Sequence, residues 1–62
     1  MEVGDIVFER LRGTKGKIVG FKPGYAVFKP FPEYEREFVS LGKTGTIALR
    51  NWMFRYPDED GL

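Results

Sequence analysis

The chain has 62 residues and a mass of 7.2 kDa, which is the size of one small domain. With 42% hydrophobic and 16% aromatic residues, its composition is typical of a folded globular protein and not of a disordered one. Cysteine and histidine are both absent. Their absence excludes a disulfide framework, the common zinc sites and catalysis by Ser-His or Cys-His pairs. We therefore expect a protein that is not an enzyme and needs no metal or cofactor.

A domain of this size buries only about 60% of the surface that its unfolded chain exposes, so its core is marginal. An aromatic core or self-association has to stabilise it, and we expect a monomer or a small homo-oligomer. No apolar run approaches the roughly 20 residues of a membrane span. The acidic start at residues 1–5 lacks the basic-then-apolar pattern of a secretion signal. Together with the initiator Met, it favours a complete, short cytoplasmic protein, bacterial or viral.

Glycines and prolines divide the chain into short runs rich in Val, Ile, Phe and Tyr, and such runs predict β-strands. The first three expected strands cover residues 6–11, 17–21 and 25–29. Residues 13–16 form the first expected turn. Residues 22–24 form the second, in which Pro23 and Gly24 suit the central positions of a type II turn.

Prolines end the third expected strand, because Pro30 and Pro32 cannot donate to a β-ladder. Residues 33–37 then predict an exposed acidic loop. Two further strands are expected, at residues 38–41 and 46–49, joined by a hairpin turn at residues 42–45.

The end of the chain has two interpretations. Residues 50–56 form either a strand, which places Trp52, Phe54 and Tyr56 on one face, or a single helical turn. Residues 58–62 are expected to form a frayed acidic tail.

Five short strands with turn signals every eight to ten residues predict an all-β domain over residues 1–57. The expected architecture is a small five-stranded antiparallel barrel, because closure removes the exposed edges of a short sheet. The phenylalanines expected to fill its core are Phe8, Phe21, Phe28, Phe38 and Phe54.

The net charge is +1, but the cations are not evenly distributed. Residues 9–29 carry six cations against Glu9, a local charge of +5 that we call the basic stripe. Lys and Arg bind phosphates and exposed aromatic rings stack on bases, so the stripe indicates a nucleic-acid-binding surface. The candidate residues for nucleic-acid or partner binding are Arg10, Arg12, Lys15, Lys17, Lys22, Tyr25, Arg50, Trp52 and Arg55. Tyr25 and Trp52 are the aromatic residues expected to be exposed.

Two binding functions are compatible with this pattern. In the first, a non-enzymatic module contacts DNA or RNA, or a protein of the transcription or translation machinery. In the second, a protein-interaction module or small regulator, for example one encoded by a phage, docks by the aromatic segment around Trp52. A net charge near zero supports the second, because it disfavours nonspecific binding to polyanions. The basic stripe nevertheless makes the first the preferred function, by a narrow margin.

Three further patterns have ordinary structural explanations. Residues 42–44, Gly-Lys-Thr, resemble the end of a phosphate-binding P-loop, but Glu37 stands where that motif needs its first glycine. Residues 13–16, Gly-Thr-Lys-Gly, match the loop of a KH domain, yet their flanks predict strands and not helices. The glutamates within residues 33–37 have no partner for acid-base chemistry. We expect two turns and a solvated loop.

Residues 4–7, Gly-Asp-Ile-Val, followed by residues 13–20, Gly-Thr-Lys-Gly-Lys-Ile-Val-Gly, resemble the opening of SH3-like small barrels. In particular they resemble the KOW segment of ribosomal and transcription-elongation proteins. There, a strand that ends in basic residues leads into a glycine-containing turn and a second strand. The resemblance covers about the first half of the chain. It implies an SH3-like barrel that contacts RNA, DNA or a protein of that machinery through its loops.

A second resemblance, to type II dihydrofolate reductase, is carried by residues 4–7, 16–21 and 24–27. That family is another SH3-like barrel of about this size, and it works as a homotetramer. Its active pore depends on a later Val-Gln-Ile-Tyr strand, where this chain has Val-Ser-Leu-Gly at residues 39–42. Because the Gln and the Tyr are missing, the resemblance implies the fold and does not support the reductase activity, and a reductase-like enzyme is kept only as a distant third alternative.

Overall fold

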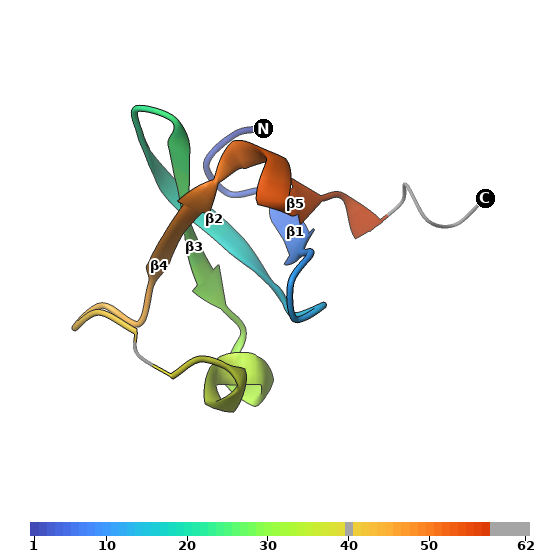
Figure 1. The fold of residues 1–62 in the computed structure, drawn as a ribbon, viewed down its shortest axis with the longest axis vertical. Coiled ribbons are helices and arrows are strands. Elements are labelled where there is room, and N and C mark those ends of the chain that lie inside the picture. Colours follow the sequence, from blue (N-terminus) through green and yellow to red (C-terminus); the bar gives the residue numbers. More distant parts are fainter. Residues whose placement is uncertain (40, 58–62) are drawn as a thin grey trace.

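The computed structural model describes residues 1–39 and 41–57, which form five β-strands and two short 3-10 helices (Figure 1). In chain order the elements are β1 (Ile6–Glu9), β2 (Lys15–Lys22), β3 (Tyr25–Pro30), η1 (Pro32–Glu37), β4 (Ile47–Arg50), η2 (Asn51–Met53) and β5 (Phe54–Arg55). The all-β prediction is therefore confirmed. Ser40 and the acidic tail expected at residues 58–62 lie outside the described residues.

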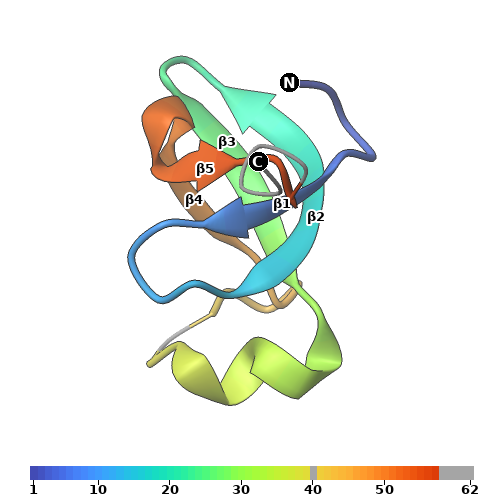
Figure 2. The ribbon, with the colours of Figure 1, turned by 90° about the vertical axis from the view of Figure 1, so that its right-hand side faces the viewer.

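One antiparallel sheet contains all five strands, in the order β4-β3-β2-β1-β5. The first and last strands lie side by side, and β2 curves strongly across the sheet (Figure 2). The sheet is not closed, because β4 and β5 remain its two edges. The expected closure into a barrel is therefore wrong. Its physical reason is the length of β5, which has only two residues, both of them in register with β1.

The β2–β3 hairpin is built around the predicted turn. Gly24 has a φ of +79°, a conformation that glycine adopts without strain and that a type II turn requires after Pro23. Both strands extend further than predicted. Their register shifts between Ile18 and Gly20, which makes Val19 the extra residue of a β-bulge.

The core lies on one side of the sheet. Its buried apolar residues are Val7, Ile18, Ala26, Phe28, Phe38 and Phe54. Phe28 is central, because its ring centroid lies 5.2 Å from that of Phe54 and 6.2 Å from that of Phe38. Tilted aromatic pairs of this kind contribute about 0.5–1.5 kcal/mol each beyond the area they bury.

Two of the phenylalanines expected in the core are not there. Phe8 is only half-buried, because side chains alternate along a strand and Val7 points into the core instead. Phe21 is 46% exposed, near the end of β2. The predicted core is therefore correct for Phe28, Phe38 and Phe54 alone.

The strand expected at residues 38–41 is wrong for the described part of that segment. The η1 helix ends at Glu37, and Phe38 follows in an extended conformation (φ −110°, ψ 134°) but pairs with no strand. Phe38 is instead buried beneath Arg12, whose guanidinium carbon lies 4.4 Å from the ring centroid. Side-chain packing, and not a β-ladder, holds this segment. The turn at residues 42–45 does form, with a hydrogen bond of 2.8 Å between the residues at its two ends.

The η2 turn decides the conformation of residues 50–56. Arg50 ends β4, one 3-10 turn follows, and the chain then enters the short β5. Trp52, Phe54 and Tyr56 consequently do not share one face. Trp52 is 71% exposed, Phe54 is in the core and Tyr56 is half-buried.

Candidate nucleic-acid interface

The side of the sheet that faces away from the core carries all six cations of the five described strands. Paired residues of neighbouring antiparallel strands point to the same side of a sheet, so the register arranges side chains in rows. Three such rows are Lys15, Phe8 and Arg55; Ile6, Lys17 and Lys29; and Lys22, Tyr25 and Arg50. We call the six cations of these rows, with Phe8 and Tyr25 between them, the cationic face.

No acidic side chain lies among these rows. The five strands that the structure describes contain one acidic residue, Glu9, and its side chain is fully buried on the opposite side of the sheet. The other acidic residues of the described part belong to the N-terminal segment and to η1. The rows of the cationic face therefore carry positive charge only, although the chain as a whole is nearly neutral.

Cations cover both aromatic rings of this face. The guanidinium carbon of Arg50 lies 4.4 Å from the ring centroid of Tyr25. Around Phe8, the corresponding distances are 4.8 Å for the guanidinium carbon of Arg55 and 5.7 Å for the Lys15 ammonium. Exposed cation-π contacts of this kind are worth about 0.5–1 kcal/mol each, so they order the long side chains while leaving their charge at the surface.

No protein-family model, curated protein or solved structure significantly matches this chain.

Within residues 1–39 and 41–57, no three Asp or Glu side chains gather closely enough to hold a metal ion. The described helices are also too short and too polar to cross a membrane. The candidate site on this sheet is therefore the cationic face, with its six cations and the half-buried rings of Phe8 and Tyr25.

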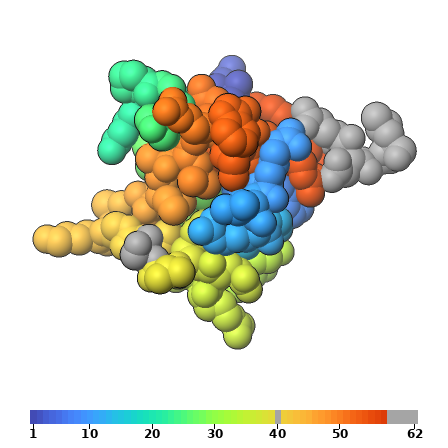
Figure 3. Space-filling model, in the orientation of Figure 1, coloured from blue at the N-terminus to red at the C-terminus, as the bar shows by residue number. Residues whose placement is uncertain are grey.

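Arg10 and Arg12 were expected to belong to the binding surface, but the structure places them in the β1–β2 loop and outside the cationic face. Arg10 Nε donates a hydrogen bond of 3.1 Å to the carbonyl oxygen of Trp52, and Arg12 Nε donates one of 3.1 Å to that of Glu37. The loop (blue in Figure 3) accordingly packs between η1 and the segment that contains η2. Both arginines hold parts of the fold together.

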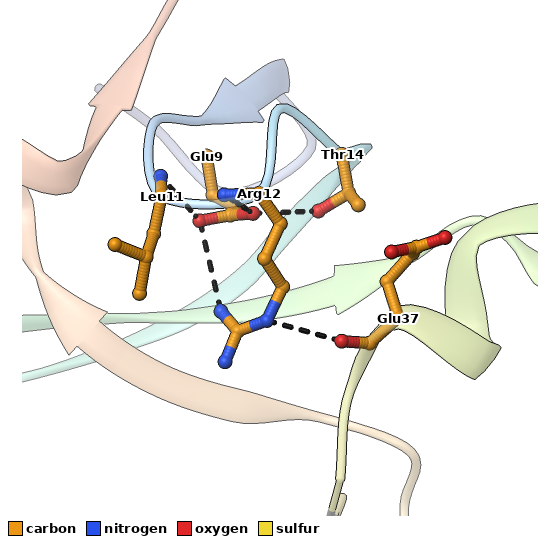
Figure 4. A network of polar contacts seen from close by, with 5 residues as sticks. All are labelled: Glu9, Leu11, Arg12, Thr14 and Glu37. Carbon is orange, nitrogen blue, oxygen red and sulfur yellow. Dashed lines mark hydrogen bonds and ion pairs between the residues drawn. The ribbon is translucent and has the colours of Figure 1, made fainter.

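A fully buried carboxylate organises the same loop (Figure 4). The oxygens of Glu9 accept hydrogen bonds from the backbone N–H groups of Leu11 (2.9 Å) and Arg12 (2.7 Å) and from the Thr14 hydroxyl (3.0 Å). The Arg12 guanidinium adds an ion pair at 3.8 Å. A carboxylate that is enclosed and fully hydrogen-bonded in this way has a structural role, because it faces no space that a substrate can enter.

Trp52 lies outside the rows of the cationic face, at the η2 turn. Its side chain is 71% exposed, as expected for it, and so is that of Leu11 in the loop that Arg10 ties to η2. Tyr25, in contrast, is only half-buried and lies within the cationic face. Tyr25 and Trp52 thus belong to different surfaces.

A second polar contact fixes the N-terminal segment. The Tyr56 hydroxyl donates a hydrogen bond of 2.6 Å to Oδ2 of Asp5, and the backbone N–H of Glu2 donates another of 2.8 Å. Both bonds lower the pKa of Asp5 below its ordinary value of 3.8, and the bond from Tyr56 has the larger effect.

Lys29 and Phe8 are members of the cationic face that the sequence did not select as candidates. Lys29 belongs to the basic stripe but is not among the predicted binding residues. Its spacing of four from Tyr25 within one strand is the signal that places both on the same side. Phe8 was assigned to the core, and the sequence offers little to distinguish it from its apolar neighbour Val7.

Proposed function

We propose that this protein is a non-enzymatic module that binds nucleic acid through its cationic face. The observation that carries the proposal is the segregation of charge: six cations and no acidic residue occupy the outward positions of the strands. Lys and Arg side chains on one surface neutralise successive phosphates and release their counterions. Contacts of this kind position a polynucleotide without selecting its sequence.

A net charge of +1 does not argue against this function. At physiological salt the Debye length is about 8 Å, so a phosphate responds mainly to the charges next to it. The acidic residues of η1 belong to no strand of the sheet, so they do not enter the rows of cations. Local charge therefore decides the binding, and the partner is DNA, RNA or a nucleoprotein assembly.

An open form of the SH3-like barrel is the fold that we propose for this module. Two features support it, the continuous meander from β1 to β4 and the return of the last strand to pair with the first. Only β4 and β5 would have to pair for the barrel to close. Residues 4–20, which carry the resemblance to a KOW segment, contain β1 and most of β2, and these two strands pair as that resemblance implies.

The test is fluorescence anisotropy with a labelled oligonucleotide at increasing salt. The double variant Lys17→Glu, Lys29→Glu reverses two cations that are paired in register at the centre of the face. Its matched control is Arg36→Glu, Lys43→Glu, which reverses two exposed cations on η1 and in the turn at residues 42–45 and so gives the same net charge. We expect the first to weaken binding at least tenfold and the control to weaken it less than threefold, by the loss of phosphate contacts. Equal effects of the two variants would contradict a localised site.

A second candidate function rests on a different observation, the exposure of Trp52 and Leu11 beside η2. Such residues anchor protein partners, since interface hot spots are enriched in tryptophan. Trp52 is the single tryptophan of the chain, so its emission reports directly on this surface. A partner protein that covers it shifts the emission to shorter wavelength, and Trp52→Ala abolishes the interaction. Nucleic acid bound on the cationic face leaves both unaffected.

A further inference from the structure

We infer that a cleft beside the cationic face accepts one unpaired base of a single-stranded polynucleotide. This inference rests on the proposed nucleic-acid function and specifies its ligand. The cleft has a volume of about 340 Å³ and is lined by Lys17, Val19, Lys29, Pro30, Phe31 and Pro32. Sites for small molecules begin at about 300 Å³, so the space suits one planar group rather than a larger ligand.

The cleft combines two kinds of lining that a nucleotide requires. Val19, Phe31 and the two prolines supply apolar surface, which favours the face of an aromatic ring. Lys17 and Lys29 are paired in register and place two ammonium groups at the same site. Within residues 1–39 and 41–57, neither lysine takes part in an ion pair. Both remain available for the phosphates on either side of a base.

The Phe31 platform is held in place before any ligand binds. Its backbone N–H donates a hydrogen bond of 3.0 Å to the carbonyl oxygen of Lys15, so the segment stays attached to β2. Prolines on both sides restrict the backbone further, and Phe31 has the extended conformation (φ −65°, ψ 153°) that a residue before proline favours. A rigid platform loses little conformational freedom on binding.

The β-bulge supplies the other apolar wall. Val19 is the extra residue of β2, and it is 39% exposed although it lies within the strand. Bulges re-aim side chains in this manner, and they are common next to binding sites. Val19 and Phe31 thus reach the same cleft from two different elements.

An unpaired base fits this cleft better than a duplex does. In a duplex the bases are stacked within the helix and only their edges and the phosphates are accessible. Single strands can turn their bases outward to stack on aromatic side chains while the backbone follows a positively charged surface. The neighbourhood of Phe31, Lys17 and Lys29 provides both partners at one place.

The experiment compares three labelled probes at low salt: an oligothymidine strand, an oligouridine strand of equal length and a DNA duplex. The protein is tested as wild type, as Phe31→Ala, as Phe31→Trp and as the double variant Lys17→Glu, Lys29→Glu. Circular dichroism and urea unfolding verify that each variant folds. Phe31→Trp keeps an aromatic platform and therefore serves as the matched control for Phe31→Ala.

We expect at least one single strand to bind about tenfold more tightly than the duplex. Phe31→Ala should weaken that binding about tenfold and leave duplex binding unchanged, whereas Phe31→Trp should retain it. A difference between the thymidine and uridine probes identifies the source of the strand as DNA or RNA. Equal binding of strands and duplex, unchanged in Phe31→Ala but weakened in the lysine variant, overturns the base cleft and leaves the proposed function intact. Absence of binding by all three probes overturns the proposed function itself.

Discussion

The hydroxyl of Thr14 donates a hydrogen bond of 3.0 Å to the carboxylate of Glu9, and both side chains are buried. The two residues stand at the two ends of the β1–β2 loop, the last residue of β1 and the residue before β2. The loop between them is closed by bonds to the same carboxylate. A buried carboxylate is tolerated here because two backbone N–H groups, a hydroxyl and a guanidinium satisfy its oxygens.

Replacement of this carboxylate should destabilise the fold. Glu9→Gln keeps the shape of the side chain but turns an amide group toward donors, so at least one buried hydrogen bond is lost. We expect the free energy of unfolding to fall by about 2 kcal/mol in urea titrations. The exposed Glu35→Gln on η1 is the control, and it should change stability by less than about 0.5 kcal/mol. A neutral Glu9→Gln would mean that the carboxylate does not hold the loop.

Gly16 should not tolerate a methyl group. A Cβ at this position would lie 2.4 Å from the carbonyl oxygen of Lys29 and 2.7 Å from the Phe28 ring, both closer than van der Waals contact. Gly16→Ala should therefore lower the free energy of unfolding by about 1–3 kcal/mol, as other overpacked cores do.

The matched control is Gly20→Ala in the same strand. Its Cβ would meet Val27 at an ordinary distance of 3.9 Å, and its φ is not in the left-handed region. We expect Gly20→Ala to be neutral or slightly stabilising in the same urea titration. Equal losses of stability in the two variants would show that the close approach of β2 and β3 at Gly16 has no energetic importance.

The bond between Asp5 and Tyr56 should make stability depend on acid pH. Because the folded state lowers the pKa of Asp5, its ionised form stabilises the fold at pH values above the ordinary 3.8. That contribution is lost as the pH falls through the lowered folded-state value. Tyr56→Phe should therefore be less stable than wild type at neutral pH, and the difference should shrink in strong acid.

Two measurements examine this prediction. An NMR titration of the Asp5 carboxyl carbon should give a higher pKa in Tyr56→Phe than in wild type. Tyr34→Phe, on η1, removes a hydroxyl from a different part of the molecule and should leave the titration of Asp5 unchanged. An unaltered Asp5 pKa in Tyr56→Phe would disprove the assigned cause.

Arg12 and Lys17 should separate stability from binding. Arg12 covers Phe38 and bonds to the carbonyl oxygen of Glu37, so Arg12→Ala should lower the free energy of unfolding by about 1 kcal/mol. It should leave oligonucleotide affinity nearly unchanged. Lys17→Ala should weaken oligonucleotide binding and leave the free energy of unfolding nearly unchanged, because the Lys17 side chain is exposed and lies within the cationic face. Both variants are measured by urea unfolding and by fluorescence anisotropy. If Arg12→Ala weakened binding and Lys17→Ala lowered stability, the division between the loop and the cationic face would be refuted.

Local patterns predicted much of this fold. Runs of β-branched and aromatic residues located the strands to within a few residues, and Pro23 and Gly24 located the turn of the β2–β3 hairpin. The strand predicted at residues 38–41 is wrong for a physical reason. Their composition suits a strand, but the burial of Phe38 under Arg12 is a contact between distant parts of the chain. Barrel closure failed in a similar way, since the 3-10 turn leaves only two residues for β5.

The sequence predicted that the candidate site is positively charged, but it did not predict which residues form it. The excess of cations in residues 9–29 indicated a charged surface. Which of those cations share a surface depends on the register between strands, which a single sequence does not reveal. Arg10 and Arg12 consequently dropped out of the cationic face, and Lys29 and Phe8 entered it.

The extra residue in β2, Val19, shifts the alternation of side chains along the strand by one position. Strict alternation would place Lys15 and Lys17 on one side and Lys22 on the other, next to the core. Past Val19 the alternation is displaced by one position, so that Lys22 pairs with Tyr25 on the outer side. Because Val19 is accommodated as a bulge, the three lysines form a single charged track about 20 Å long, taking 3.3 Å for each of the six paired steps from Lys15 to Lys22. Deletion of Val19 would leave Lys22 on the outer side, because Gly20 would then follow Ile18 in regular alternation, but it would remove the exposed valine from the middle of the track.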